Sequence, residues 1–197
     1  MAWIKNGTPD TLTSAGTTLS ISDLTANKFN QFMSHRIPTG GNFDNDDLYF
    51  NGDHTSTVNA YKVSTNGSSS APIINKDGVI IASGNAAWDY FHVCYMVSIS
   101  GEEKLGIVVT CAGGGSGAGS TIHRNEIVSK FAPSSLSTNV TQVAIIEQGS
   151  GNHAIGSNLS ALGTEGVEEL NVQDGAIFYE TDTNKSYVLN SGTWTEL

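Results

Sequence analysis

The sequence has few cations and no long apolar run. Its 197 residues include 9 Lys and Arg against 19 Asp and Glu, which gives a formal net charge of −10. This acidic balance argues against a nucleic acid or an anionic membrane surface as a direct partner, because both are bound by clustered Lys and Arg. No apolar stretch approaches the roughly 18 residues that a membrane-spanning helix needs. The first residues lack the apolar segment of a secretory signal, so none is expected.

Long, straight side chains that favour helices are also scarce, since only 14% of the residues are charged. Ser, Thr and Asn are abundant instead, and Gly alone numbers 22. These residues favour turns and strand ends over helix interiors. Short runs of aromatic and β-branched residues recur between them, which a disordered chain would lack. The composition therefore predicts a folded all-β protein.

Alternating patterns and turn signals predict about eleven strands. They span residues 17–22, 28–37, 47–51, 58–64, 78–82, 88–100, 105–111, 125–131, 138–147, 176–180 and 186–190. Helical spacing occurs only over residues 157–162. We therefore expect an antiparallel β-sandwich of jelly-roll (concanavalin-like) type with a C-terminal β-hairpin extension. The expected organisation is an N-terminal arm over residues 1–10, the sandwich over 11–165 and the hairpin extension over 166–197.

The two cysteines lie in neighbouring predicted strands. If residues 101–104 form a four-residue loop, Ser100 pairs with Leu105 and Cys94 lies opposite Cys111, within reach of a disulfide. The alternative is a pair of reduced thiols that act as small core hydrophobes. Neither CxxC spacing nor a paired His motif is present, so the sequence supports no structural zinc site.

The motifs that resemble catalytic sites are incomplete, and we assign no catalytic residue. The glycine tract at 112–120 lacks the Lys and the following helix of a phosphate-binding loop. Residues 114–118 approach the GxSxG nucleophile motif, but Ala118 occupies the last glycine position. We interpret the tract as an exposed loop suited to contacting another subunit. Spacing places no carboxylate beside any of the five histidines, which are His35, His54, His92, His123 and His153.

The acidic segment 42–47 is the best candidate for a metal site. Calcium prefers several oxygen ligands, and Asn51 and Asp53 follow nearby. The segment lacks the DxDxDG loop with a distal Glu, so a solvated turn is the alternative, and we assign no metal ligand or cofactor. The candidate calcium ligands are Asp44, Asp46 and Asp47.

Three tryptophans could stack on sugar rings. They are Trp3, Trp88 and Trp194. Trp88 precedes a long predicted strand, so we expect it to lie in the core.

Seven segments together resemble a group of virion-associated β-sandwich proteins of marine viruses of microbes. These segments are residues 11–31, 48–53, 60–67, 98–104, 115–120, 123–131 and 157–163. The tail, residues 175–196, resembles a short module at the ends of phage tail-fibre and other virion proteins. In that module a turn, here residues 181–185, joins two strands, and a late tryptophan, here Trp194, packs on the hairpin. Leu189 stands where the module commonly has an aromatic residue.

This resemblance implies a non-enzymatic structural protein of the virion, which decorates or forms the capsid or belongs to a tail fibre. Its partners would be further copies of itself and other virion proteins, reached through the arms at residues 1–10 and 166–197. An acidic protein also suits an outer face better than a DNA-filled interior.

Two other functions stay open. The first is a carbohydrate-binding adhesion module of concanavalin-like type, which would bind a host-surface glycan through exposed aromatics and calcium. The second is a polysaccharide hydrolase, which needs two carboxylates across a groove, and the spacing places no such pair.

Overall fold

The protein is all-β, as the sequence predicts. The structure, a computed structural model, describes residues 3–39, 45–83, 88–113, 118–119, 122–165, 174–191 and 193–197. Within these ranges every strand pair is antiparallel. None of the described residues forms a helix that is long and apolar enough to cross a membrane. The chain divides into two units, Met1–Glu165 and Gly166–Leu197.

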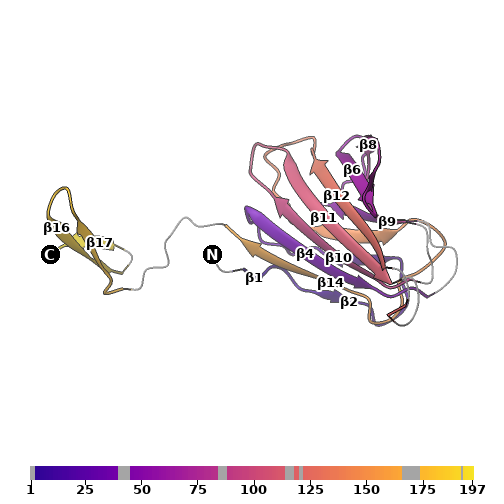
Figure 1. Ribbon diagram of the computed structural model, residues 1–197, viewed down its shortest axis with the longest axis horizontal. Helices are drawn as coiled ribbons and strands as arrows, with labels where there is room; N and C mark the ends of the chain where they lie inside the picture. Colours follow the sequence, from indigo (N-terminus) through magenta and orange to yellow (C-terminus); the bar gives the residue numbers. More distant parts are fainter. Residues whose placement is uncertain are drawn as a thin grey trace. The chain divides into compact units, whose positions relative to one another are not determined.

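The first unit consists of two sheets (Figure 1). The smaller sheet has the order β3-β13-β5-β9, and its strands are β3 (Thr18–Ile21), β13 (Val143–Glu147), β5 (Asn45–Phe50) and β9 (Val79–Ser83). The larger, ten-stranded sheet has the order β1-β14-β4-β10-β11-β12-β6-β7, with β2 beside β14 and β8 beside β6. Its strands are β1 (Ile4–Lys5), β2 (Asp10–Thr11), β4 (Phe29–Arg36), β6 (Asn59–Thr65), β7 (Ser68–Ser69), β8 (Ile73–Lys76), β10 (Tyr90–Val97), β11 (Lys104–Gly113), β12 (Ile122–Phe131) and β14 (Asn158–Thr164).

One apolar core lies between these sheets. The long strands β4, β10 and β11 of the larger sheet bury alternate residues, because successive side chains point to opposite faces of a sheet. The Phe50 ring from the smaller sheet lies 6.2 Å from Phe32 and 5.4 Å from Phe131, both on the larger sheet. Two antiparallel sheets that share a core in this way are consistent with a β-sandwich.

Two parts of the first unit differ from the sequence-based expectation. Residues 157–162, where helical spacing was noted, lie mostly in strand β14, which buries Leu159 and Ala161 and turns the residues between them outward. Strands β1 and β2 pair with β14, so this stretch is part of the sheet rather than a separate N-terminal arm. Two-residue strands carry too little alternation to be recognised in a sequence.

The second unit is a three-stranded sheet rather than a two-stranded hairpin. Its strands are β15 (Ile177–Glu180), β16 (Lys185–Asn190) and β17 (Thr193–Glu196), in the order β15-β16-β17. Trp194 lies on the additional strand, and its ring is 6.0 Å from that of Phe178. Asn184 takes a positive φ of 55° in the turn between β15 and β16, a conformation that Asn tolerates better than most residues.

The predicted pairing of the two cysteines is wrong. The register of β10 and β11 places Cys94 opposite Val108 and Cys111 opposite Phe91, which is three residues away from the expected pairing. An odd shift moves a side chain to the other face of the sheet. Cys94 is therefore buried in the core, where burial raises the pKa of its thiol to about 12, and Cys111 is exposed. Both cysteines are free, and only Cys94 acts as a core hydrophobe.

Candidate interaction surface

The outer face of the ten-stranded sheet is apolar along its central strands. Every outward side chain of β10, and every outward side chain of β11 up to the terminal Gly113, is apolar. Exposed fractions of 54% for Ile107, 53% for Leu105 and 48% for Tyr95 show that the structure leaves this surface uncovered. We name as the outer apolar face the side chains of Phe29, Phe91, Val93, Tyr95, Val97, Leu105, Ile107, Val109, Cys111 and Val128.

The register of the sheet makes this face continuous across four strands. Val97 on β10 pairs with Phe29 on β4 and with Leu105 on β11. Ile107 on β11 pairs in the same way with Tyr95 and with Val128 on β12. Directly opposed side chains in a sheet touch one another, so these pairs form unbroken apolar rows across the strands.

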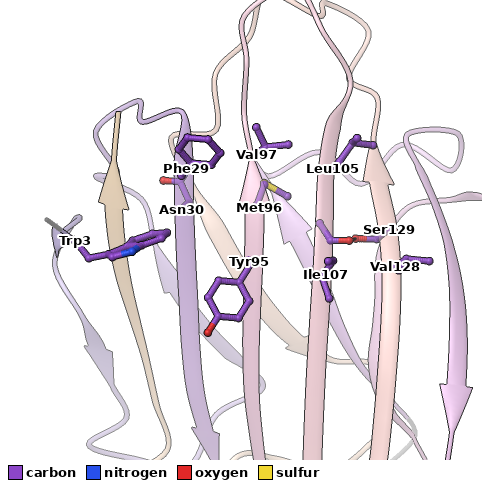
Figure 2. Close-up of a pocket in the computed structure, with 11 residues that line it drawn as sticks. Trp3, Phe29, Asn30, Tyr95, Met96, Val97, Leu105, Ile107, Val128 and Ser129 are labelled. Carbon is purple, nitrogen blue, oxygen red and sulfur yellow. Dashed lines mark hydrogen bonds between the residues drawn. The ribbon is translucent and has the colours of Figure 1, made fainter. Parts of the chain in front are cut away.

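A hollow of about 490 Å³ lies over one end of the outer apolar face. Figure 2 shows Trp3, Phe29, Tyr95 and Ile107 arranged around it, on the segment before β1 and on β4, β10 and β11. Asn30 and Ser129, its polar lining residues, are 1% and 9% exposed. The hollow therefore offers apolar contact area and few accessible hydrogen-bonding groups.

Cations surround the outer apolar face, although the chain as a whole is acidic. Lys62 on β6 pairs with Val128, and the Lys28 amine lies 5.6 Å from the Phe29 ring centre. The cations on or beside the face number five of the nine in the chain: Lys5, Lys28, Lys62, Arg124 and Lys130.

Two carboxylates accompany these cations. Glu126 lies 3.6 Å from Arg124, and Glu103 lies 2.8 Å from Lys130. Three further exposed carboxylates lie at the ends of the face: Asp89, Glu102 and Glu165. Five cations therefore stand against five carboxylates around the face, whereas the other four cations of the chain stand against fourteen carboxylates. The surroundings of the face are thus far less acidic than the rest of the chain.

A second notable arrangement is a buried polar cluster between the two sheets. Asp46 on β5 is fully buried, and its carboxylate lies 3.5 Å from Nε of Arg36 and 2.9 Å from Nε2 of His153. Nε2 of His92 lies 3.9 Å from the same carboxylate. The Arg36 guanidinium also stacks over the Tyr90 ring at 5.2 Å and donates a hydrogen bond to the Trp88 carbonyl. These contacts compensate part of the cost of burying the charges.

His92 is held in one neutral form within this cluster. Burial is the main cause that lowers its pKa to about 4, and the Asp46 carboxylate opposes that shift. The Thr110 hydroxyl donates to the Ile81 carbonyl and lies 2.9 Å from Nδ1 of His92. Nδ1 must therefore carry the proton and donate to Thr110, which leaves the lone pair on Nε2 facing Asp46 and Arg36.

The buried polar cluster is closed to solvent. The four side chains Arg36, Asp46, His92 and His153 are at most 3% exposed. A cavity of about 10 Å³ beside His92 and Ser34 holds at most one water molecule. The cluster therefore links the two sheets and offers no room for a substrate.

The candidate calcium ligands do not converge. Asp46 belongs to the buried polar cluster, whereas Asp47 faces Asp77 on the other side of β5. Burial, with Asp77 and then Asp46 as further causes, raises the pKa of Asp47 to about 6. Asp44 lies outside the described residues. Among the residues that are described, no group of three or more His, Cys, Asp or Glu side chains is placed to hold a metal ion.

Asn51 and Asp53, which follow the acidic segment, form hydrogen bonds with the backbone. Asn51 accepts hydrogen bonds from the backbone amides of Thr141 and Gln142, and Asp53 accepts one from Thr55. These bonds fix the end of β5 against the segment before β13.

The remaining candidates are scattered. His54 packs on Tyr49, with ring centres 4.3 Å apart, and His123 packs on the half-buried Trp88. His35 lies on the outward side of β4. Trp3 is 39% exposed at the hollow and Trp194 is 42% exposed in the second unit. Most of the glycine tract lies outside the described residues.

Comparisons of the chain with protein-family models, with curated proteins and with solved structures found no match.

Sequence reasoning missed the buried polar cluster, although a signal was present. Arg36 shares the core-facing side of its strand with Phe32, and His92 shares one with Cys94. A charged residue at a core-facing position requires a buried partner. That partner, Asp46, lies on a strand of the other sheet, so spacing along the chain could not identify it.

Proposed function

We propose that this chain is a non-enzymatic structural subunit that assembles on the outer surface of a virus particle, as a capsid decoration or shell protein or as part of a tail fibre. The observation that carries the proposal is the outer apolar face. A soluble protein rarely leaves a continuous apolar patch on its surface unless the patch binds something. Eight consecutive outward positions without a charge, at the centre of the larger sheet, favour a binding surface for protein.

The sequence supports the viral setting through its resemblance to virion-associated β-sandwich proteins. The two antiparallel sheets of the first unit agree with that resemblance, and we propose that their connectivity is of the jelly-roll (concanavalin-like) type. The net charge of −10 favours a position outside the nucleic acid compartment. Partners would be further copies of the chain and other virion proteins.

Antibody labelling of virus particles tests this function. Particles are purified from a lysate in which this gene is expressed, labelled with antibodies raised against the chain and imaged by electron microscopy. We expect label at regular positions on the outside of every particle. Label found only in the soluble fraction would contradict the proposal.

A carbohydrate-binding adhesion module is the second candidate, and one observation favours it. Trp3 and Tyr95 are both exposed at the hollow, where aromatic rings could stack on a sugar of the host surface. It ranks second because Asn30 and Ser129, the polar groups there, are buried. Glycan-array binding that is lost in Tyr95→Ala would support this candidate, and loss in EDTA would indicate calcium dependence.

A further inference from the structure

We infer that the outer apolar face receives the C-terminal three-stranded unit of a second copy of this chain, so that copies associate head to tail. This inference names the contact through which the proposed assembly occurs, and it rests on that proposed function. Two surfaces carry it, one on each unit. Each surface has large exposed apolar side chains, and the two surfaces match in chemistry.

The surface on the second unit is one side of its small sheet. The register pairs Phe178 with Tyr187 and Leu189 with Trp194, so these four side chains lie on the same side. The Phe178 ring lies 6.3 Å from Tyr187 and 6.0 Å from Trp194, and they line a hollow of about 390 Å³. We name these four side chains the tail aromatic face.

A single three-stranded layer does not cover its own apolar side. Phe178 is 51% exposed and Trp194 is 42% exposed. Protein domains are normally built from at least two packed layers, and an exposed aromatic layer is stabilised when a second one packs on it. The outer apolar face, which is also a single exposed sheet surface, supplies a second layer of the same kind.

The distribution of charge favours the tail of another copy, rather than a second outer apolar face, as the partner of the outer apolar face. Face-to-face pairing of two sandwiches would bring together two surfaces that carry the same cations, Lys62, Arg124 and Lys130 among them. Residues 166–197 instead carry six carboxylates and one lysine. Glu180 and Glu196 lie on the same side of the small sheet as the tail aromatic face, together with Lys185, whose amine is 2.9 Å from the Glu196 carboxylate. Cations around one apolar surface therefore meet carboxylates around the other.

Sedimentation velocity of the full chain tests the inference with two blocking variants. Ile107→Glu places a carboxylate in the outer apolar face, and Trp194→Glu places one in the tail aromatic face. Ile107 is 54% exposed and Trp194 is 42% exposed, so neither substitution buries a charge in the core. Matched controls are Ile74→Glu, whose site is 64% exposed on β8, and Ile177→Glu, whose site is 68% exposed on the opposite side of the small sheet.

We expect the wild type and both controls to form assemblies larger than one chain. Each blocking variant alone should sediment as a monomer of 20.7 kDa. An equimolar mixture of the two should form a one-to-one complex, because the intact tail of Ile107→Glu docks on the intact outer apolar face of Trp194→Glu. The complex also shows that both variants are folded. It should weaken as salt is raised, because part of the attraction is electrostatic.

Three results would overturn the inference. If Trp194→Glu assembled to the same extent as the wild type, the contact would be face-to-face pairing of two outer apolar faces. If both blocking variants assembled to the same extent as the wild type, the contact would involve neither the outer apolar face nor the tail aromatic face. A wild type that stays monomeric would indicate docking within one chain or none. Particle labelling distinguishes these failures from failure of the proposed function, since the chain could still bind the virion through other proteins.

Discussion

Two buried ionisable side chains respond to pH in opposite directions. Burial lowers the pKa of His92 to about 4, so stability that depends on neutral His92 is present above pH 6.5 and is lost as the pH falls toward 4. The pKa of Asp47 is raised from 3.8 to about 6, so its contribution is present below pH 3.8 and is lost as the pH rises through 6. Near neutral pH, Asp47 is therefore a charged carboxylate that is only 8% exposed.

Replacing Asp47 with Asn removes this charge and keeps the shape of the protonated side chain. We expect Asp47→Asn to raise the free energy of unfolding at pH 8 by about 3 kcal/mol, in line with a pKa shift of about two units. The gain should vanish near pH 4, where wild-type Asp47 is protonated. Urea denaturation at both pH values measures it, with Asp89→Asn, at an exposed site, as the control. A gain that does not change with pH would contradict this account.

At the scale of elements, one lysine side chain links two loops of the first unit, the loop between β10 and β11 and the loop between β12 and β13. Lys104, the first residue of β11, is fully buried. Its amine donates hydrogen bonds to the carbonyls of Ile99 and Glu102 before β11 and to that of Leu136 after β12. Burial lowers the pKa of Lys104, and Glu102 opposes that shift. The ammonium group has three N–H donors, and each can donate to one of these three backbone carbonyls. The Lys104 side chain therefore supplies hydrogen bonds to carbonyls of both loops.

Lys104→Met should break this junction and keep the aliphatic part of the side chain. Loss of the amine leaves three carbonyls without these bonds, so we expect the free energy of unfolding to fall by about 3 kcal/mol. Chemical denaturation measures the change, and Lys62→Met, on the exposed side of β6, is the matched control with little expected effect. Equal effects of the two substitutions would show that the buried contacts do not stabilise the fold.

At the scale of the whole molecule, the large apolar core belongs to one unit. Every residue of that core cluster lies between Leu19 and Ala161. The described residues of the second unit, 174–191 and 193–197, add none to it. The sandwich core should therefore form without the second unit.

A chain shortened to residues 1–165 should fold and remain monomeric. We expect its melting temperature to lie within a few degrees of that of the first unit in the full chain, and its circular dichroism to stay that of β-structure. Thermal melting and sedimentation velocity measure both properties. An unfolded truncated chain would mean that residues 166–197 complete the core.

Much of the strand content could be predicted from the sequence, and little of the polar arrangement could. Period-two alternation predicted β4 and β10 because each of these strands is long and half-buried. It missed β1, β2 and β7, since no local pattern marks a two-residue strand, and it also missed the longer strands β8, β14 and β17. Spacing could not bring Asp46 together with Arg36 or His153, because these side chains meet through the packing of one sheet on the other.

The sequence by itself determined that the chain forms extended segments and which residues within a segment share a side, since both follow from local periodicity. Only the tertiary structure decided which side is buried. In β10 the more apolar side, with Phe91 and Tyr95, faces outward, and the side with His92 and Cys94 faces the core. Pairing with neighbouring strands and packing on the second sheet set this orientation, because burial is a property of the assembled sheets rather than of one strand.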